Sequence, residues 1–247
     1  MRDWLWIGRS AAWLGLFAAI LALWVWTIGM AAMSGVDWRG RPVGMNMMPM
    51  ESLGALLPMW LLMMAAMMLP VMAPALAAYE RLIPRTDATR AGWFGVLAGY
   101  LAVWLFVAAA LAAVQLALMR SGHLDGLGAA TTQWFSAGLL VAVGLFQLTR
   151  IKEVCHGRCH SPTMHFLGHW RPGLAGGLRM GAGLGAWCAA CCWGYMALAF
   201  TGGAMSLLWM AGATALMVLE KLPQIGHALL KPVGVAMILS GLALPFL

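Results

Sequence analysis

Residues 53–79 read "LGALLPMWLLMMAAMMLPVMAPALAAY" and contain no charged side chain. About 20 apolar residues in a helix cross the hydrocarbon core of a bilayer, so this stretch by itself predicts a membrane-spanning helix. Across the 247 residues of the chain, 63% are hydrophobic and 9% are charged, whereas a soluble domain carries roughly 25% charged residues. The sequence therefore predicts that lipid, rather than water, surrounds most of this protein.

Further apolar segments of similar length follow along the chain. Lipid offers no hydrogen-bond partners, and the segments lack the strict alternation of barrel strands, so we expect α-helices. The predicted fold is an all-α, polytopic integral membrane helix bundle forming one transmembrane domain over residues 1–247. About seven spans are expected, or six if the last segment, which Lys231 and Pro232 shorten, does not cross. The segments are residues 10–33, 53–79, 92–118, 133–150, 178–200, 204–220 and 229–246.

The basic residues predict the orientation of the bundle. With seven spans and a cytoplasmic N-terminus, only Arg39, Arg41 and Arg120 of the 15 lysines and arginines lie outside. Cytoplasmic loops of membrane proteins carry an excess of Lys and Arg. The net charge of +7 thus fits a cytoplasmic face beside anionic lipid, and we expect no nucleic-acid partner.

Residues 187–193 read "WCAACCW" inside the predicted fifth span. Cys188, Cys191 and Cys192 are spaced i, i+3 and i+4, which places them on one helix face within about 6 Å along the axis. Such a face indicates a soft-metal site, a redox thiol pair, or small apolar side chains used for packing. The same segment has a glycine at every fourth position from 173 to 185, which predicts close packing against another helix.

Methionine is abundant, with 21 residues in the chain. In the second span the methionines recur at four-residue spacing, which forms stripes of thioethers at a depth comparable to that of the thiols. Thioether and thiolate ligands select Cu(I) over harder ions, although methionine is also an adaptable core residue. The candidate ligands here are Met64, Met67, Met68 and Met72.

A Cys/His-rich stretch lies in the predicted cytoplasmic loop between spans four and five, residues 151–177. Cysteine and histidine together suit zinc or copper, and the alternative is an ordinary polar loop. The candidate ligands are Cys155, Cys159, His160 and His169, with His156 and His165 beside them.

Two further features flank the spans. The predicted outer loop contains "MNMMPM", in which Met45, Met47, Met48 and Met50 would capture a soft ion or anchor the loop in lipid. Glu220 ends the sixth span and is either a charge partner of a bound cation or an interfacial partner of Lys221.

The segments "MMAAMMLP", "CHGRCHSP" and "CAACCW", in this order, resemble a bacterial family of predicted metal-binding integral membrane proteins of unknown function. The likeness covers roughly residues 53–240 and implies a multi-pass protein of the inner (plasma) membrane with a metal site. The family pattern falls on Met64, Met67, Met68, Pro70, Pro74, Lys152, Cys155, Cys159, Pro162, Cys188, Cys191, Cys192, Trp193, Glu220 and Lys221.

These observations favour a protein that handles a soft metal, with Cu(I) expected and zinc as the alternative. Lipid, the metal ion, and a metallochaperone or membrane-complex partner are the expected partners. No phosphate-binding loop, nucleophile elbow or catalytic carboxylate pair is present, so the sequence favours binding over catalysis. Two alternatives stay open: a membrane thiol/quinone oxidoreductase using Cys188 and Cys191, and a structural or assembly subunit of a membrane complex.

Overall fold

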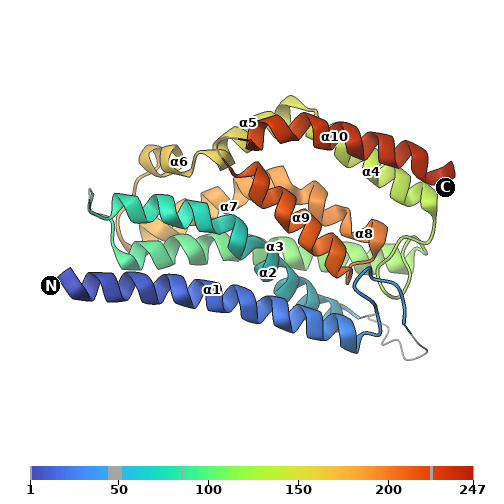
Figure 1. Ribbon diagram of the computed structural model, residues 1–247, viewed down its shortest axis with the longest axis horizontal. Coiled ribbons are helices and arrows are strands. Elements are labelled where there is room, and N and C mark those ends of the chain that lie inside the picture. Colours follow the sequence, from blue (N-terminus) through green and yellow to red (C-terminus); the bar gives the residue numbers. More distant parts are fainter. Residues whose placement is uncertain (1, 44–51, 85, 223–224, 247) are drawn as a thin grey trace.

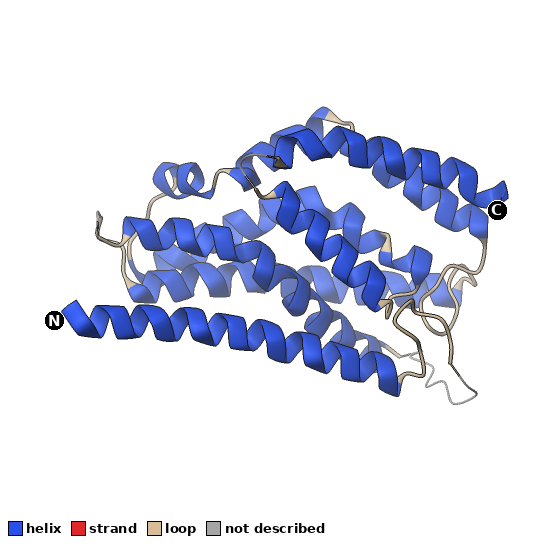
Figure 2. Cartoon of the chain, viewed as in Figure 1, coloured by secondary structure: helices blue, strands red, loops and turns tan. Residues whose placement is uncertain are grey.

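The computed structural model describes residues 2–43, 52–84, 86–222 and 225–246, and within these residues it consists of helices without a β-strand (Figures 1 and 2). The all-α prediction is therefore confirmed. The helices are α1 (Arg2–Met33), α2 (Leu53–Leu82), α3 (Arg90–Arg120), α4 (Gln133–Gln147), α5 (Arg150–His160), α6 (Pro162–Gly168), α7 (Gly173–Ala197), α8 (Ala199–Gly202), α9 (Leu207–Glu220), α10 (Gly226–Ala243) and the short 3₁₀ helix η1 (Leu244–Phe246).

Five helix starts are fixed by a hydroxyl side chain. The hydroxyl accepts a hydrogen bond from a backbone N–H in the first turn, which the helix itself cannot satisfy. These capping residues are Ser52, Thr89, Thr132, Thr149 and Ser206, before α2, α3, α4, α5 and α9.

All seven predicted spans fall on helices, but two of them do not form a single helix of membrane-spanning length. Five helical segments are long and apolar enough to cross a membrane, and a sixth results if α4 and α5 count as one broken span. The predicted span 133–150 bends by 67° between α4 and α5, where Thr149 starts a new helix. The predicted span 204–220 begins only at Leu207 and has 14 residues, because Gly203 adopts a φ of +93° and Ser206 caps the helix.

The glycines of α7 pack against α3, as their four-residue spacing predicts. A Cβ on Gly177 would lie 2.2 Å from the carbonyl oxygen of Gly92, and one on Gly181 would lie 2.0 Å from that of Val96. A Cβ on Gly185 would lie 3.2 Å from the carbonyl of Tyr100. This contact brings the side chain of Tyr100 to the cysteines of α7.

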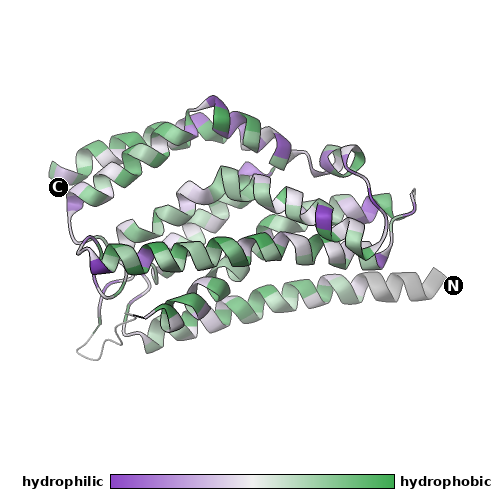
Figure 3. Ribbon diagram, turned by 180° about the vertical axis from the view of Figure 1, so that it is seen from behind, coloured by the Kyte–Doolittle hydropathy of each residue, from purple (hydrophilic) through white to green (hydrophobic). Residues whose placement is uncertain are grey.

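The remaining helices surround this pair. Helices α2 and α9 lie beside α3 and α7, α1 lies along one edge of the bundle, and α4 and α10 lie side by side along the opposite edge (Figure 1). Hydrophobic residues cover most of the length of the helices, and hydrophilic residues gather near the ends and along α5 (Figure 3). This distribution is the one expected of helices that cross a bilayer.

Candidate metal centre

The three cysteines of α7 share one buried face. The Sγ atoms of Cys188 and Cys192 are 3.9 Å apart, and those of Cys191 and Cys192 are 3.3 Å apart. Each side chain is at most 3% exposed, and all three thiols are free. The predicted helical spacing therefore gives a compact group of sulfur atoms inside the bundle.

A fourth cysteine joins this group from α5. The Sγ atoms of Cys159, Cys188 and Cys191 all lie within 4.8 Å of one another, and we call these three residues the thiol cluster. The sharp turn after α4 directs α5 back along α7, which carries Cys159 to the other thiols. The Cys/His-rich stretch and the cysteines of α7 thus contribute to one site.

The other candidates of this stretch lie elsewhere. Cys155 is buried one turn before Cys159 but is not part of the thiol cluster. The ring of His169 stacks on that of His165 with centroids 4.9 Å apart, and this pair lies on and after α6. Cys192 Sγ lies beside the thiol cluster, 3.3 Å from the Sγ of Cys191 and 3.9 Å from that of Cys188. Within the described part of the chain, no three Cys, His, Asp or Glu side chains outside these four cysteines converge as closely. The side chain of His160 lies outside the described residues, as do Met45, Met47, Met48 and Met50.

Tyr100 connects the cluster to the methionines of α2. Its hydroxyl lies 3.2 Å from Cys188 Sγ and 3.8 Å from Met68 Sδ. Met64, Met67, Met68 and Met72 are each at most 3% exposed. Their stripe faces the protein interior; Met68 contacts Tyr100, and Met72 lines a cavity together with Cys159.

A small cavity borders the cluster. Its volume is about 20 Å³, and its lining includes Met72, Tyr100, Cys159 and Lys221. A volume of about 10–15 Å³ on this measure holds one water molecule. The cavity therefore has room for one water-sized molecule or ion next to a thiol, a thioether and an ammonium group.

Two lysines place positive charge around the thiols. Lys221 Nζ donates to Cys159 Sγ and, at 3.2 Å, to the carbonyl oxygen of Cys159. Lys152 is fully buried and donates to the carbonyl oxygen of Cys191 at 2.8 Å and to Glu220 Oε2 at 3.1 Å. Both ammonium groups fix backbone segments that carry cluster cysteines.

Glu220 pairs with Lys152 rather than with its neighbour Lys221. It also accepts hydrogen bonds from Tyr195 and, at 3.3 Å, from Gln147. A buried carboxylate is tolerated when it is paired and hydrogen-bonded in this way. Glu220 is therefore a charged residue of the site, one step removed from the sulfur atoms.

Sequence reasoning missed the roles of Tyr100, Lys152 and Tyr195. The chain has only three tyrosines, and a hydroxyl inside an apolar span is a signal that could have been followed. Lys152 belongs to the family pattern, but its position near a predicted loop gave no indication of burial.

The burial of the thiols is unfavourable to the oxidoreductase alternative. Thiol exchange needs an accessible thiolate, and each thiol of the cluster is at most 3% exposed. Three convergent sulfur donors are instead the ligands that soft metals select.

A protein-family model described as "PpoB2: Copper chaperone" matches residues 57–244. No curated protein and no solved structure matches the chain. The matched region contains the thiol cluster, both lysines and the methionine stripe, and the copper label agrees with the resemblance to a predicted metal-binding family.

Proposed function

The chain belongs to the PpoB2 family of copper chaperones, and we propose that it carries one Cu(I) ion as cargo on Cys159, Cys188 and Cys191. The observation that carries the proposal is the convergence of these three buried Sγ atoms within 4.8 Å. They come from two helices that meet only in the folded protein, so the fold itself assembles the donor set.

The donor set favours Cu(I) over Zn²⁺. Structural zinc sites are almost always four-coordinate, with sulfur, nitrogen or oxygen ligands. The thiol cluster brings together three sulfur donors with a fourth thiol, Cys192, beside them, and the distinguishing feature is the thioethers: Met68 contacts Tyr100, and Met72 lines the adjacent cavity. Thioethers are neutral, soft ligands that select Cu(I), so they supply further donors without adding negative charge.

The surrounding charges fit a monovalent cargo. Lys152 and Glu220 neutralise each other, which leaves Lys221 as the cation that contacts a thiol of the cluster. Cysteine binds a metal as the thiolate, so the three ligands carry three negative charges. One Cu(I) ion and the ammonium group of Lys221 balance two of them, and the Tyr100 hydroxyl, 3.2 Å from Cys188 Sγ, can donate a hydrogen bond toward the third. Such a balance matters because an uncompensated charge in a buried site is costly.

We propose that this site lies inside a bacterial inner membrane, with the N-terminus in the cytoplasm. The support is the apolar character of the long helices and the distribution of basic residues in the sequence. Delivery of the ion then requires a partner, which would be a metallochaperone or a membrane copper enzyme. The structural-subunit alternative stays a prediction that partner capture in mild detergent would test.

The chain offers a matched pair of cysteines for the test. Cys155 and Cys159 lie on the same helix and are both buried, but only Cys159 belongs to the thiol cluster. Protein purified in detergent under reducing conditions is loaded with Cu(I), desalted and analysed for copper. We expect about one copper ion per chain in the unchanged protein and in Cys155→Ser, because Cys155 lies outside the group of converging thiols.

Cys159→Ser and Cys188→Ser should lose most of this copper while eluting as unchanged, monodisperse protein in size-exclusion chromatography. Full copper in Cys159→Ser, or equal losses in Cys155→Ser and Cys159→Ser, would overturn the proposed site.

A further inference from the structure

A second pocket lies between α6 and α7, away from the thiol cluster. Its volume is about 260 Å³. Two histidines, two arginines and a tryptophan contribute most of its lining: His165, His169, Arg171, Arg179 and Trp187. We call it the arginine pocket. Neither copper binding nor the packing of the bundle uses it.

The arginine pocket carries unbalanced positive charge. Arg171 and Arg179 are exposed, and neither forms an ion pair with a described residue; the described pairs involve Arg90, Lys152 and Lys231. A third guanidinium, that of Arg158, stacks over the Trp187 ring at 4.6 Å. A concave site lined by one sign of charge concentrates ions of the opposite sign, so the arginine pocket suits an anion.

The two histidines are held in place by the backbone. His165 Nε2 lies 3.1 Å from the carbonyl oxygen of Met180, and His169 Nδ1 lies 3.0 Å from that of His165. Burial lowers the pKa of His165, and the nearby His169 and Arg158 lower it further, against the backbone bond. The fixed charge of the pocket therefore comes from the arginines, which suit the oxygens of a phosphate group.

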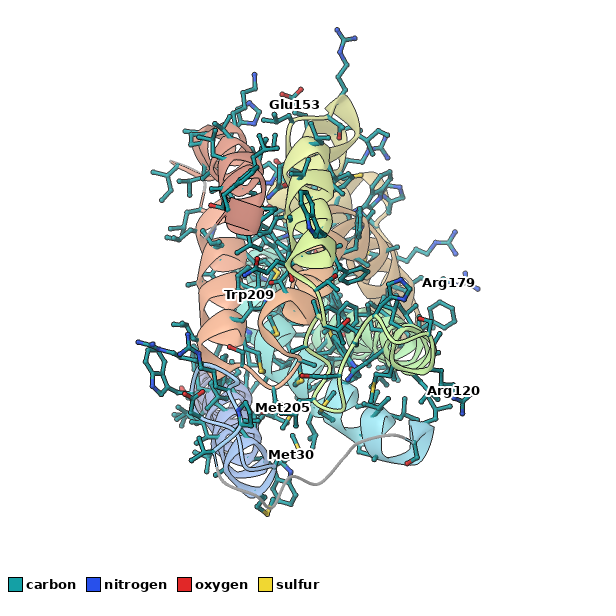
Figure 4. All side chains as sticks on the ribbon, turned by 90° about the vertical axis from the view of Figure 1, so that its right-hand side faces the viewer. Met30, Arg120, Glu153, Arg179, Met205 and Trp209 are labelled. Carbon is teal, nitrogen blue, oxygen red and sulfur yellow. The ribbon has the colours of Figure 1, made fainter. Side chains whose placement is uncertain are left out.

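An apolar strip continues from the pocket along α7. Ala186 and Ala190 are exposed, and Trp193 is 42% exposed. With Arg179 they occur at spacings of seven, four and three residues, which keeps them on one face of the helix. Arg179 itself lies at the outer edge of the bundle (Figure 4). A charged pocket thus leads directly into an exposed apolar surface.

We propose that the arginine pocket binds the phosphate of an anionic phospholipid, whose acyl chains lie along Ala186, Ala190 and Trp193. An anion alone would not need the apolar strip, and an apolar ligand alone would not need two guanidinium groups in the pocket and a third beside it. Basic pockets at the cytoplasmic ends of membrane helices are suited to anionic headgroups. The inference rests on the proposed membrane location and not on the identity of the metal.

The test compares lipid binding in two charge variants. Protein in a mild detergent is titrated with phosphatidylglycerol or phosphatidylcholine, and bound lipid is counted by native mass spectrometry. The test variant is Arg171→Gln/Arg179→Gln. The matched control is Arg81→Gln, which removes an exposed charge from the last turn of α2, outside the arginine pocket.

We expect the unchanged protein and Arg81→Gln to retain phosphatidylglycerol in preference to phosphatidylcholine. The double variant should bind phosphatidylglycerol about tenfold more weakly or worse, because it loses two charge-assisted contacts. Copper content should stay unchanged in all variants, which separates this result from a failure of the copper site.

Three outcomes would overturn the proposal. Unchanged retention of phosphatidylglycerol in the double variant would show that the arginine pocket does not bind the lipid. Equal weakening in Arg81→Gln would show a general effect of surface charge. Displacement of the lipid by inorganic phosphate at millimolar concentration would assign the pocket to a free anion.

Discussion

Replacement of Lys152 by methionine tests the charge arrangement around the thiol cluster. The Lys152 Nζ to Glu220 Oε2 distance is 3.1 Å, and the two side chains are 0% and 3% exposed. At this distance and an effective dielectric constant of about 20, two unit charges attract each other by about 5 kcal/mol. Lys152→Met would leave Glu220 buried without this partner, and breaking such a pair costs about 3–5 kcal/mol.

We therefore expect Lys152→Met to lower the free energy of unfolding by about 3–5 kcal/mol, and the apparent Tm in detergent by roughly 10 °C. The double variant Lys152→Met/Glu220→Gln should recover most of this loss, because it removes both charges and keeps an amide that can bond to Tyr195 and Gln147. Lys231→Met is the control, since Lys231 pairs with Glu153 at 3.7 Å and is 71% exposed; it should cost less than about 1 kcal/mol.

Thermal unfolding followed by circular dichroism measures all three variants. The reasoning would be refuted if Lys152→Met were as stable as Lys231→Met. It would also be refuted if the double variant were as unstable as the single one, because the loss would then come from packing and not from the broken ion pair.

Two further substitutions test the packing and the counter-charge. Gly181→Ala should lower the free energy of unfolding by about 1–3 kcal/mol, because its Cβ would lie 2.0 Å from the carbonyl oxygen of Val96. The control is Gly138→Ala, which has open space around its Cβ and should be neutral or slightly stabilising. Equal Tm values for the two variants would contradict the packing argument. Lys221→Gln should weaken Cu(I) binding about tenfold in a competition titration, because the copper–thiolate group loses the cation beside Cys159. An unchanged affinity would show that Lys221 does not balance the charge of the site.

The sequence predicts most reliably those features of the structure that depend on the geometry of a single helix. The i, i+3, i+4 spacing placed Cys188, Cys191 and Cys192 on one face, and the structure has their thiols together. The four-residue glycine spacing on α7 predicted the close approach to α3. Both features depend only on helix geometry, which a sequence specifies locally.

Contacts between distant segments were not predictable in the same way. Cys159 joins the thiol cluster because the chain bends by 67° after α4, and no spacing rule gives the direction of a bend. Adjacent residues on a helix do not face each other, so Glu220 turns away from Lys221 and pairs with Lys152, which is 68 positions away. Tyr100 reaches Cys188 only because glycines let α3 and α7 approach.

X-ray absorption spectroscopy of the copper-loaded protein would test the central claim most directly. The donor set of Cys159, Cys188 and Cys191, with thioethers nearby, predicts Cu(I) surrounded by sulfur alone. The small amount of copper that remains in Cys159→Ser should have fewer sulfur neighbours, whereas the copper in Cys155→Ser should be unchanged. A first shell of nitrogen or oxygen atoms that is unchanged in Cys159→Ser would contradict the account and place the copper outside the thiol cluster.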